Sequence, residues 1–337
     1  MEKEIAALAV ITALICPTYA LRSFHLGCST TDQFLHGMAE VAQGFGDTQE
    51  IGKYTIAGAG MHVLWHQREG RFQESTLRDQ RWDAVICAGF PNGWELGIEA
   101  DVTYSSYFYD LAYQGNPDAI LYTWSVYADN DPSKGSWDAQ WNNQQWEGAY
   151  ASKGYHEALF LAAREKYGSA RVRMMPIGHA MNKLHERIQS GSTTRFSSIF
   201  ELYGDGIHLN EYGGYLGVMV HFAVLFGKNP QGAIRESKWG FWQVTTTIDE
   251  EFAALAQEIA WETVTELSEY TGVNGGETSA FPHTLRPMSA AGGLTSPGGV
   301  AVFTLDGRSL NAGRGNREYL SPPHHFLTPG LRFIVSR

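Results

Sequence analysis

Residues 22–43 read RSFHLGCSTTDQFLHGMAEVAQ, and this stretch joins an extended segment directly to a helical one. Arg22–Leu26 has the residue pattern of a β-strand, and Asp32–Gln43 has apolar residues at helical spacing. Only a short polar connection containing Gly27 and Ser29 separates the two segments. A strand that passes at once into a helix is the first half of a βαβ unit, so this stretch predicts a parallel sheet.

The same alternation continues along the next part of the chain and predicts the fold class. Further strands are expected at Lys53–Ile56, Asp83–Ala88, Ala119–Trp124 and Arg171–Met175. Helices are expected from Gly60 and at Ile98–Tyr113, Gln145–Lys166 and His179–Gln189. Strands separated by helices imply an α/β protein with a parallel sheet, and functional groups in such sheets lie at the carboxyl ends of the strands.

Two more helices are expected after residue 210. The apolar residues that follow Asn210 have helical spacing. The sequence Thr247-Ile248-Asp249-Glu250 matches a capping box and predicts the start of a second helix, which should end near Gly272.

Composition limits the function classes. The 337 residues contain 25 Lys and Arg against 36 Asp and Glu, a net charge of −11, which argues against a general nucleic-acid binder. Hydrophobic residues make up 43% and charged residues 18%, so a sizeable buried core is possible. The length predicts one large domain with a small one, or two of ordinary size.

The first twenty residues have the features of a signal peptide. An apolar run, Ile5–Cys16, precedes Thr18 and Ala20, which have the small-x-small spacing of a cleavage site. We therefore expect a signal peptide at residues 1–20 and a secreted, periplasmic or cell-surface protein; the alternative is an N-terminal core helix or strand. No later stretch reaches 18 apolar residues, so stable membrane insertion is not expected.

Three segments combine reactive or flexible residues with predicted strand ends. Ser29 follows the first strand at a helix start, where backbone N–H groups can stabilise an oxyanion; alternatively, Ser29 only caps that helix. Gly58 lies in a small-residue turn after the second strand, where a backbone N–H can approach a ligand closely. Asp205 and His208 are three residues apart before a helix, so the carboxylate can fix the imidazole tautomer.

These segments, in this order, resemble those of the SGNH (GDSL-type) hydrolases, and the Asp-Gly-Ile-His block is their most specific part. The resemblance covers about residues 22–226. It implies a flavodoxin-like three-layer α/β/α fold with a parallel sheet, and a catalytic triad of Ser29 as nucleophile, His208 as base and Asp205 orienting the histidine. It also implies an oxyanion hole formed by the N–H of Ser29, Gly58 and an Asn of a third block.

The third block departs from the family pattern of Gly-x-Asn-Asp. The chain reads CAGFPNG from Cys87 to Gly93, so Asn92 lies one place late and no Asp follows it. Asn92 is either the third oxyanion donor or a turn residue before Gly93.

Tryptophans and histidines supply further candidates for the substrate site. Trp137, Trp141 and Trp146 lie in a polar segment after a predicted strand end, and form either a sugar-stacking platform or a loop that packs its own aromatics. His62 and His66 are four residues apart without the Glu of a metalloprotease motif. His62 is therefore expected to line the substrate site or the surface, and we predict neither a metal nor a cofactor.

Cys28 and Cys87 lie at the ends of the first and third predicted strands, which are neighbours in the sheet order 2-1-3-4-5. They are either two buried thiols or, in an oxidising compartment, a disulfide.

The C-terminal part changes in composition. Residues 273–299 are rich in Gly, Ser, Thr and Pro and are predicted to be a linker. Residues 300–337 are predicted to be a small β module, which resembles the sorting modules of proteins exported by the type IX route; the alternative is a hairpin packed on the preceding domain. Residues 21–272 then form the hydrolase domain.

The resemblance implies an ester hydrolase acting on a small-molecule or polysaccharide ester. Secretion, tryptophan content and family habit together favour short acyl esters, in particular acetyl groups on carbohydrate. Three alternatives remain open at this point: a lipase or lysophospholipase, an O-acetyltransferase, and a non-catalytic carbohydrate-binding protein on the same fold.

Overall fold

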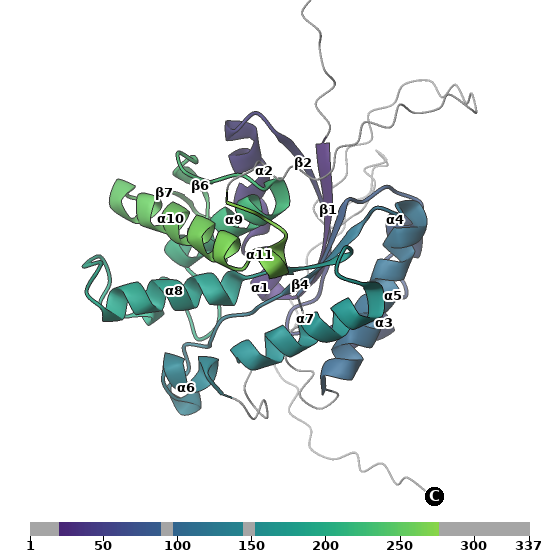
Figure 1. Cartoon of the computed structure of the whole chain (residues 1–337), viewed down its shortest axis with the longest axis horizontal. Coiled ribbons are helices and arrows are strands. Elements are labelled where there is room, and N and C mark those ends of the chain that lie inside the picture. Colours follow the sequence, from purple (N-terminus) through teal and green to yellow (C-terminus); the bar gives the residue numbers. More distant parts are fainter. Residues whose placement is uncertain (1–19, 89–96, 144–151, 276–337) are drawn as a thin grey trace, which may run out of the picture. The chain divides into compact units, whose positions relative to one another are not determined.

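The computed structural model describes residues 20–88, 97–143 and 152–275. Residues 1–19 of the predicted signal peptide, most of the predicted linker and the predicted C-terminal β module lie outside these residues, as do Asn92 and Trp146. Within the described residues, a five-stranded sheet is covered by helices on both faces (Figure 1).

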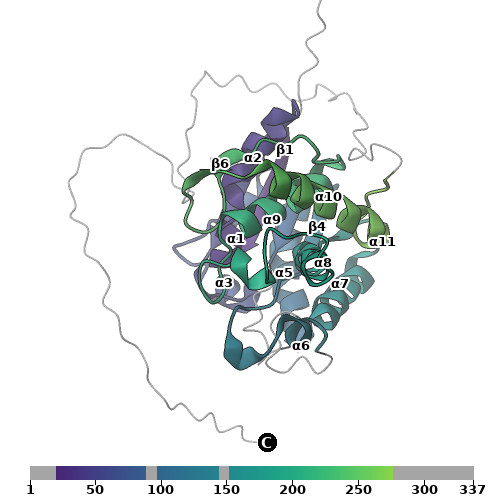
Figure 2. The same cartoon turned by 90° about the vertical axis from the view of Figure 1, so that its left-hand side faces the viewer.

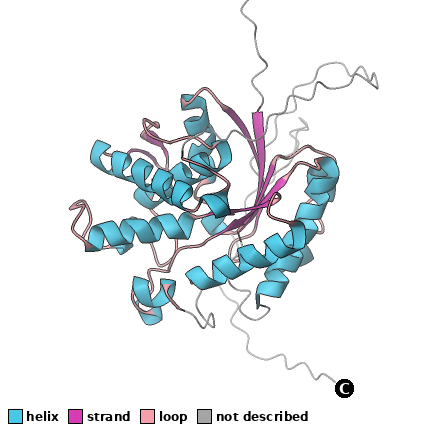
Figure 3. Ribbon diagram, viewed as in Figure 1, coloured by secondary structure: helices cyan, strands magenta, loops and turns pink. Residues whose placement is uncertain are grey.

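The sheet is parallel throughout and has the order β2-β1-β3-β4-β5. Its strands are β1 (Ala20–Gly27), β2 (Thr48–Thr55), β3 (Ala84–Cys87), β4 (Ile120–Trp124) and β5 (Val172–Met175). Each lies on or within a few residues of a strand predicted from the sequence. The α/β fold class, the three-layer arrangement and the strand order are therefore confirmed (Figure 3).

Burial on both faces explains why the central strands are continuous apolar runs. Every residue of β3 and β4 is buried. Parallel sheets need cover on both faces because each crossover connection places a helix against the sheet. β1 and β3 are central strands, so the carboxyl end of β1 lies in the middle of the sheet edge, between β2 and β3.

Two groups of helices provide this cover. The first group is α2 (Leu35–Gly44), α8 (Ile177–Gln189), α9 (Glu211–Phe226) and α10 (Glu250–Glu266). The second group is α3 (Met61–His66), α4 (Glu74–Arg78), α5 (Gly97–Gly115) and α7 (Lys153–Tyr167). Figure 2 shows the first group toward the viewer. α9 is buried along almost its whole length, since α2, α8 and α10 all pack against it.

The start of α10 differs from the sequence prediction. The N-cap residue is Asp249, whose side chain accepts a hydrogen bond from the N–H of Phe252 at 2.9 Å. Thr247 lies instead in β7 (Thr245–Thr247), which pairs antiparallel with β6 (Glu236–Lys238). The predicted capping box is wrong because its first residue is held in a two-stranded hairpin that the sequence pattern did not indicate.

Cys28 and Cys87 are free, buried thiols. Burial raises the pKa of the Cys87 thiol to about 12, so it stays protonated and unreactive. The first of the two alternatives for these cysteines is therefore confirmed.

None of the helices in the described ranges combines the length and the apolar character needed to span a bilayer.

Candidate active site

Ser29 lies at the carboxyl end of β1, at the point where the strand turns into a helix. Cys28 is the extended N-cap residue of α1 (Ser29–Asp32), and Ser29 is its first helical residue, half-buried. The turn is tight: a Cβ on Gly27 would lie 2.2 Å from Oγ1 of Thr31 and 3.0 Å from Cβ of Ala88. Gly27 is therefore needed for space.

Replacing Gly27 by alanine should destabilise the turn that holds Ser29. The new methyl group overlaps the buried Thr31, whose branched side chain cannot rotate away freely, so we expect a loss of about 1–3 kcal/mol in the free energy of unfolding and lower activity. Denaturant unfolding measures this loss. Gly44→Ala is the matched control, because its Cβ would have its nearest contact at 3.4 Å. Equal stability of the two variants would refute the role of Gly27.

Asp205 and His208 lie in a loop closed by an antiparallel bridge between Tyr203 and Leu209. Oδ1 of Asp205 accepts hydrogen bonds from the backbone N–H of Ile207 at 2.8 Å and of His208 at 2.7 Å. Oδ2 of Asp205 accepts a hydrogen bond from Nδ1 of His208 at 2.8 Å. Partial burial acts to raise the pKa of the Asp205 carboxyl, but these hydrogen bonds outweigh it and hold the pKa below its ordinary value.

The loop brings His208 against Ser29, which is 179 residues away in the chain. Nε2 of His208 lies 2.8 Å from Oγ of Ser29. A carboxylate can only accept, so Nδ1 carries the ring proton of the neutral imidazole and Nε2 is left to accept from the serine hydroxyl. The structure thus joins Ser29, His208 and Asp205 in one hydrogen-bonded chain, the arrangement of a nucleophile, a base and a group that orients the base.

Gln33 connects the serine turn to the histidine loop, and the sequence analysis missed it. Its buried side chain accepts a hydrogen bond from the N–H of Leu209, next to His208, at 2.9 Å. The same amide donates to the hydroxyl of Tyr127, which is also buried. One side chain therefore fixes the position of the loop relative to α1. No local pattern marked this glutamine, because its partners are 94 and 176 residues away.

Gly58 lies in the turn between β2 and α3, after the strand that runs parallel to β1. Thr55, the last residue of β2, pairs with Gly27, so the Gly58 turn follows the same edge of the sheet as Ser29. Its φ of 68° is in the left-handed region, which favours glycine. The assignment of Gly58 and Asn92 as oxyanion donors stays a prediction.

Two aromatic residues from the β6–β7 hairpin cover His208. The ring of Phe241 stacks on the imidazole, with centroids 3.8 Å apart and an interplanar angle of 18°. Trp242 approaches edge-on, with ring centroids 6.5 Å apart. The N–H of Phe241 donates to the carbonyl of Leu209 at 3.1 Å, which anchors the hairpin to the histidine loop. In the sequence, the aromatic cluster Trp239-Gly240-Phe241-Trp242 is the feature that could have indicated an aromatic cover over the histidine.

Trp137 and Trp141 are not available as a sugar-stacking platform. They lie in α6 (Trp137–Trp141) with exposed fractions of 1% and 2%, and Nε1 of Trp137 donates to Oδ1 of Asn182 at 2.9 Å. Both rings are part of the core, so neither presents a face to a ligand. The alternative, a segment that packs its own aromatics, describes these two residues correctly.

His62 lies half-buried on α3, with its ring 6.2 Å from that of Tyr104. Nε2 of His66 lies 3.0 Å from the hydroxyl of the same tyrosine. In the ranges that the structure describes, no three His, Cys, Asp or Glu residues are grouped so that they could hold a metal ion.

A second arrangement of a serine, a histidine and a carboxylate is present in the described residues, but its serine is sealed from solvent. Oγ of Ser125 lies 3.1 Å from Nδ1 of His179, and Nε2 of His179 lies 3.5 Å from Glu157. Ser125 has no exposed surface, and its Oγ also accepts from the N–H of Gly178. Burial lowers the pKa of His179, although Glu157 opposes this. This arrangement links β4, α7 and α8 and cannot meet a substrate.

Comparisons with known proteins bear on the fold. No protein-family model and no curated protein sequence matches this chain. Among solved structures, a DUF4886 family protein from Bacteroides uniformis superposes with a TM-score of 0.51 at 14% identity, over 73% of this chain and 95% of that one. A member of the lipolytic protein G-D-S-L family from Veillonella parvula has a TM-score of 0.38 at 13% identity, over 58% and 92%.

Three features occur together in this chain: the sheet order β2-β1-β3-β4-β5, a serine directly after β1, and an Asp-Gly-Ile-His loop before α9. The chain has an SGNH-type fold. In this SGNH-type fold, the hydrogen-bonded chain of three side chains lies at the carboxyl edge of the sheet, where functional groups of parallel sheets gather.

Proposed function

We propose that this protein is a serine ester hydrolase that works through an acyl-enzyme. The observation that carries the proposal is the chain from Ser29 through His208 to Asp205, with two contacts of 2.8 Å at the carboxyl edge of the sheet. The hydroxyl is half-buried and already hydrogen-bonded to a nitrogen that can take its proton.

The proposed reaction has two halves. Oγ of Ser29 attacks the ester carbonyl carbon while Nε2 of His208 takes the hydroxyl proton. The tetrahedral intermediate then collapses: its C–O bond to the alcohol breaks, and His208 gives its proton to the departing alcohol oxygen. In the second half, water attacks the acyl-enzyme, His208 takes a water proton, and the carboxylic acid leaves as the proton returns to Ser29.

Three donors are proposed to stabilise the negative oxygen of each tetrahedral intermediate. The N–H of Ser29 lies at the start of α1. Gly58 follows β2 and Asn92 follows β3 in the sequence, and β2 and β3 are the two strands that flank β1. Removing one such donor typically lowers the rate by about 10²–10³, so an imperfect third block still allows activity.

The proposed substrate is a short acyl ester, in particular acetyl, on carbohydrate, and the proposed location is secreted, periplasmic or cell-surface. The apolar N-terminal run supports the location. The exposed aromatic surface of Trp242 next to His208 supports an ester whose alcohol part is large enough to contact that surface.

A fluorophosphonate probe tests the proposal, because it labels a serine only if that serine is an activated nucleophile. We expect labelling at Ser29, identified by peptide mass spectrometry, and none in Ser29→Ala. Ser125→Ala is the matched control: Ser125 also contacts a histidine, but it is buried and should contribute no label. An unlabelled wild type that binds acetylated sugar would favour the non-catalytic alternative.

The hydrolysis rate should rise with pH between 5 and 8. Asp205 loses its charge only as the pH falls through its lowered pKa, so it stays ionised throughout this range. Only the neutral imidazole of His208 can accept the serine proton, so we expect kcat/KM for an acetyl ester to be higher at pH 8 than at pH 5. A pH–rate profile that is flat over this range, with chemistry rate-limiting, would contradict the role of His208.

A further inference from the structure

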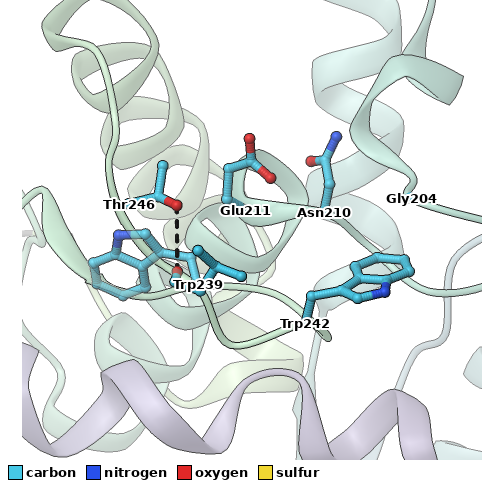
Figure 4. Close-up of a pocket in the computed structure, with 7 residues that line it drawn as sticks. Gly204, Asn210, Glu211, Trp239, Trp242 and Thr246 are labelled. Atoms are coloured by element: carbon cyan, nitrogen blue, oxygen red, sulfur yellow. Dashed lines mark hydrogen bonds between the residues drawn. The ribbon is translucent and has the colours of Figure 1, made fainter.

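A groove lies beside the histidine loop, with a volume of about 260 Å³. It is lined by residues of that loop, of the first turn of α9 and of the β6–β7 hairpin: Gly204, Asn210, Glu211, Trp239, Trp242, Val244 and Thr246. Figure 4 shows the side chains of Glu211, Thr246 and Trp242 around the same space.

Two contacts connect this groove to the triad. The N–H of Gly204 donates to the carbonyl of His208 at 2.9 Å, so the groove and the triad share one loop. The ring of Trp242 packs closely against that loop: a Cβ built on Gly204 would lie 2.0 Å from Cζ3 of the ring. Because the centroid of the same ring is 6.5 Å from that of the imidazole, a molecule bound against Trp242 has its substituents next to the reacting atoms.

Two of the groove's apolar residues are among the most exposed large apolar side chains in the described part of the chain. Trp242 is 49% exposed and Val244 64%, whereas Trp239, three residues earlier, is 2% exposed. Burying apolar surface stabilises a protein by about 25 cal/mol for each Å² removed from water, and these two exposed side chains forgo that stabilisation. Large exposed apolar side chains that border a groove beside reactive groups are typical of a ligand site.

Two of the groove's polar side chains can accept hydrogen bonds from a ligand. The carboxylate of Glu211 has no hydrogen bond or ion pair with any residue that the structure describes, and it is partly buried. The hydroxyl of Thr246 donates to the carbonyl of Val244 at 3.3 Å, which leaves its lone pairs free to accept (Figure 4). Both groups therefore favour a ligand that carries hydroxyl donors.

We propose that this groove binds the sugar ring on the alcohol side of the ester, with its C–H face on the indole of Trp242 and its hydroxyls donating to Glu211 and Thr246. This inference rests on the proposed function and specifies its substrate. A fatty acyl chain fits less well, because burying the Glu211 carboxylate against hydrocarbon would remove its hydration without compensation.

The test compares three substrates that are all hydrolysed at an ester bond but differ in their alcohol or acyl part. The ester 6-O-acetylglucose carries a sugar ring with free hydroxyls, ethyl acetate has only a small alcohol, and ethyl octanoate has a long acyl chain. In Trp242→Ala, we expect the ratio of kcat/KM for 6-O-acetylglucose to that for ethyl acetate to fall about 10- to 100-fold, mainly through KM. Trp242→Phe should recover most of this ratio, because it keeps an aromatic face.

Tyr113→Ala is the matched control. Tyr113 is an aromatic residue that is 39% exposed and lies near the end of α5, the helix that precedes β4. It therefore lies near the amino ends of the strands, at the edge of the sheet opposite to Ser29 and His208. We expect all three of its rate ratios to match those of the wild type. A change in Tyr113→Ala equal to that in Trp242→Ala would mean that any exposed aromatic has this effect, and would overturn the proposal.

Binding without turnover supplies a second readout. In Ser29→Ala, titration with 6-O-acetylglucose should give a saturable change in tryptophan fluorescence, and the double variant with Trp242→Phe should lose it. If the wild type hydrolyses ethyl acetate but neither the ratio nor the fluorescence depends on Trp242, the groove assignment fails and the esterase proposal stands. A selective loss for ethyl octanoate would assign the groove to the acyl chain instead. A wild type that hydrolyses no ester and takes no fluorophosphonate label refutes the esterase proposal, and the fluorescence arm then decides the groove by itself.

Discussion

Ser29→Ala is expected to abolish ester hydrolysis, lowering kcat by on the order of 10⁵–10⁶, since the members of a triad act as a unit. The variant removes the only atom that can attack the carbonyl carbon. The hydroxyl is half-buried and its hydrogen bond goes to Nε2 of His208, so the loss leaves the packing of α1 unchanged. Initial rates on an acetyl ester and thermal unfolding of the same sample give both quantities.

Ser190→Ala is the control for this substitution. Ser190 is the exposed residue that ends α8, and its hydroxyl contacts only its own turn and Ser192. This variant should keep wild-type activity. A folded Ser29→Ala protein that still turns over its ester would disprove the triad assignment.

Asp205→Asn is expected to lower kcat by about 10³–10⁴ while the loop keeps its shape. The amide oxygen of the new residue can still accept from the N–H groups of Ile207 and His208. Its NH₂ group then faces Nδ1 of His208, where the carboxylate oxygen was. Two donors cannot share one contact, so the imidazole proton moves to Nε2. In that tautomer His208 points a proton at Ser29 and cannot act as its base.

Nitrogen NMR of the labelled imidazole reports the tautomer directly, and kcat reports its consequence. Asp131→Asn is a close control, because Asp131 also accepts from a backbone N–H two residues on, that of Ser133, in an exposed turn without a histidine. It should leave kcat unchanged. If Asp205→Asn shows the wild-type tautomer and the wild-type kcat, the orienting role of Asp205 is wrong.

Much of the geometry of the candidate site could be predicted from the sequence, for a topological reason. Parallel strands in the order 2-1-3-4-5 bring their carboxyl ends to one edge, so residues that follow different strands must meet there. Ser29 and the Gly58 turn are placed by this rule alone. Asp205 and His208 are three residues apart, so their mutual contact is local.

Other expectations failed where long-range packing decided the outcome. Whether a tryptophan is exposed depends on what covers it, and Trp137 is covered by α8 through a contact with Asn182, 45 residues away. The capping box failed because Thr247 pairs across a hairpin with Glu236. In both places the local residue types were consistent with the prediction, and a distant segment overrode it.

The sequence by itself determined the α/β class, because hydrophobic period and turn chemistry are properties of short segments. The strand order and the identity of the three residues in the hydrogen-bonded chain followed from its resemblance to the SGNH hydrolases. Only the tertiary structure decided what surrounds His208. Gly240, with a φ of 70°, packs so closely on the carbonyl of Asn210 that a Cβ would lie 2.4 Å from the oxygen. This contact places Phe241 on the imidazole and Trp242 beside the groove. The hairpin that carries them is too short to show a period, and its position is set by packing against residues about thirty positions earlier in the chain.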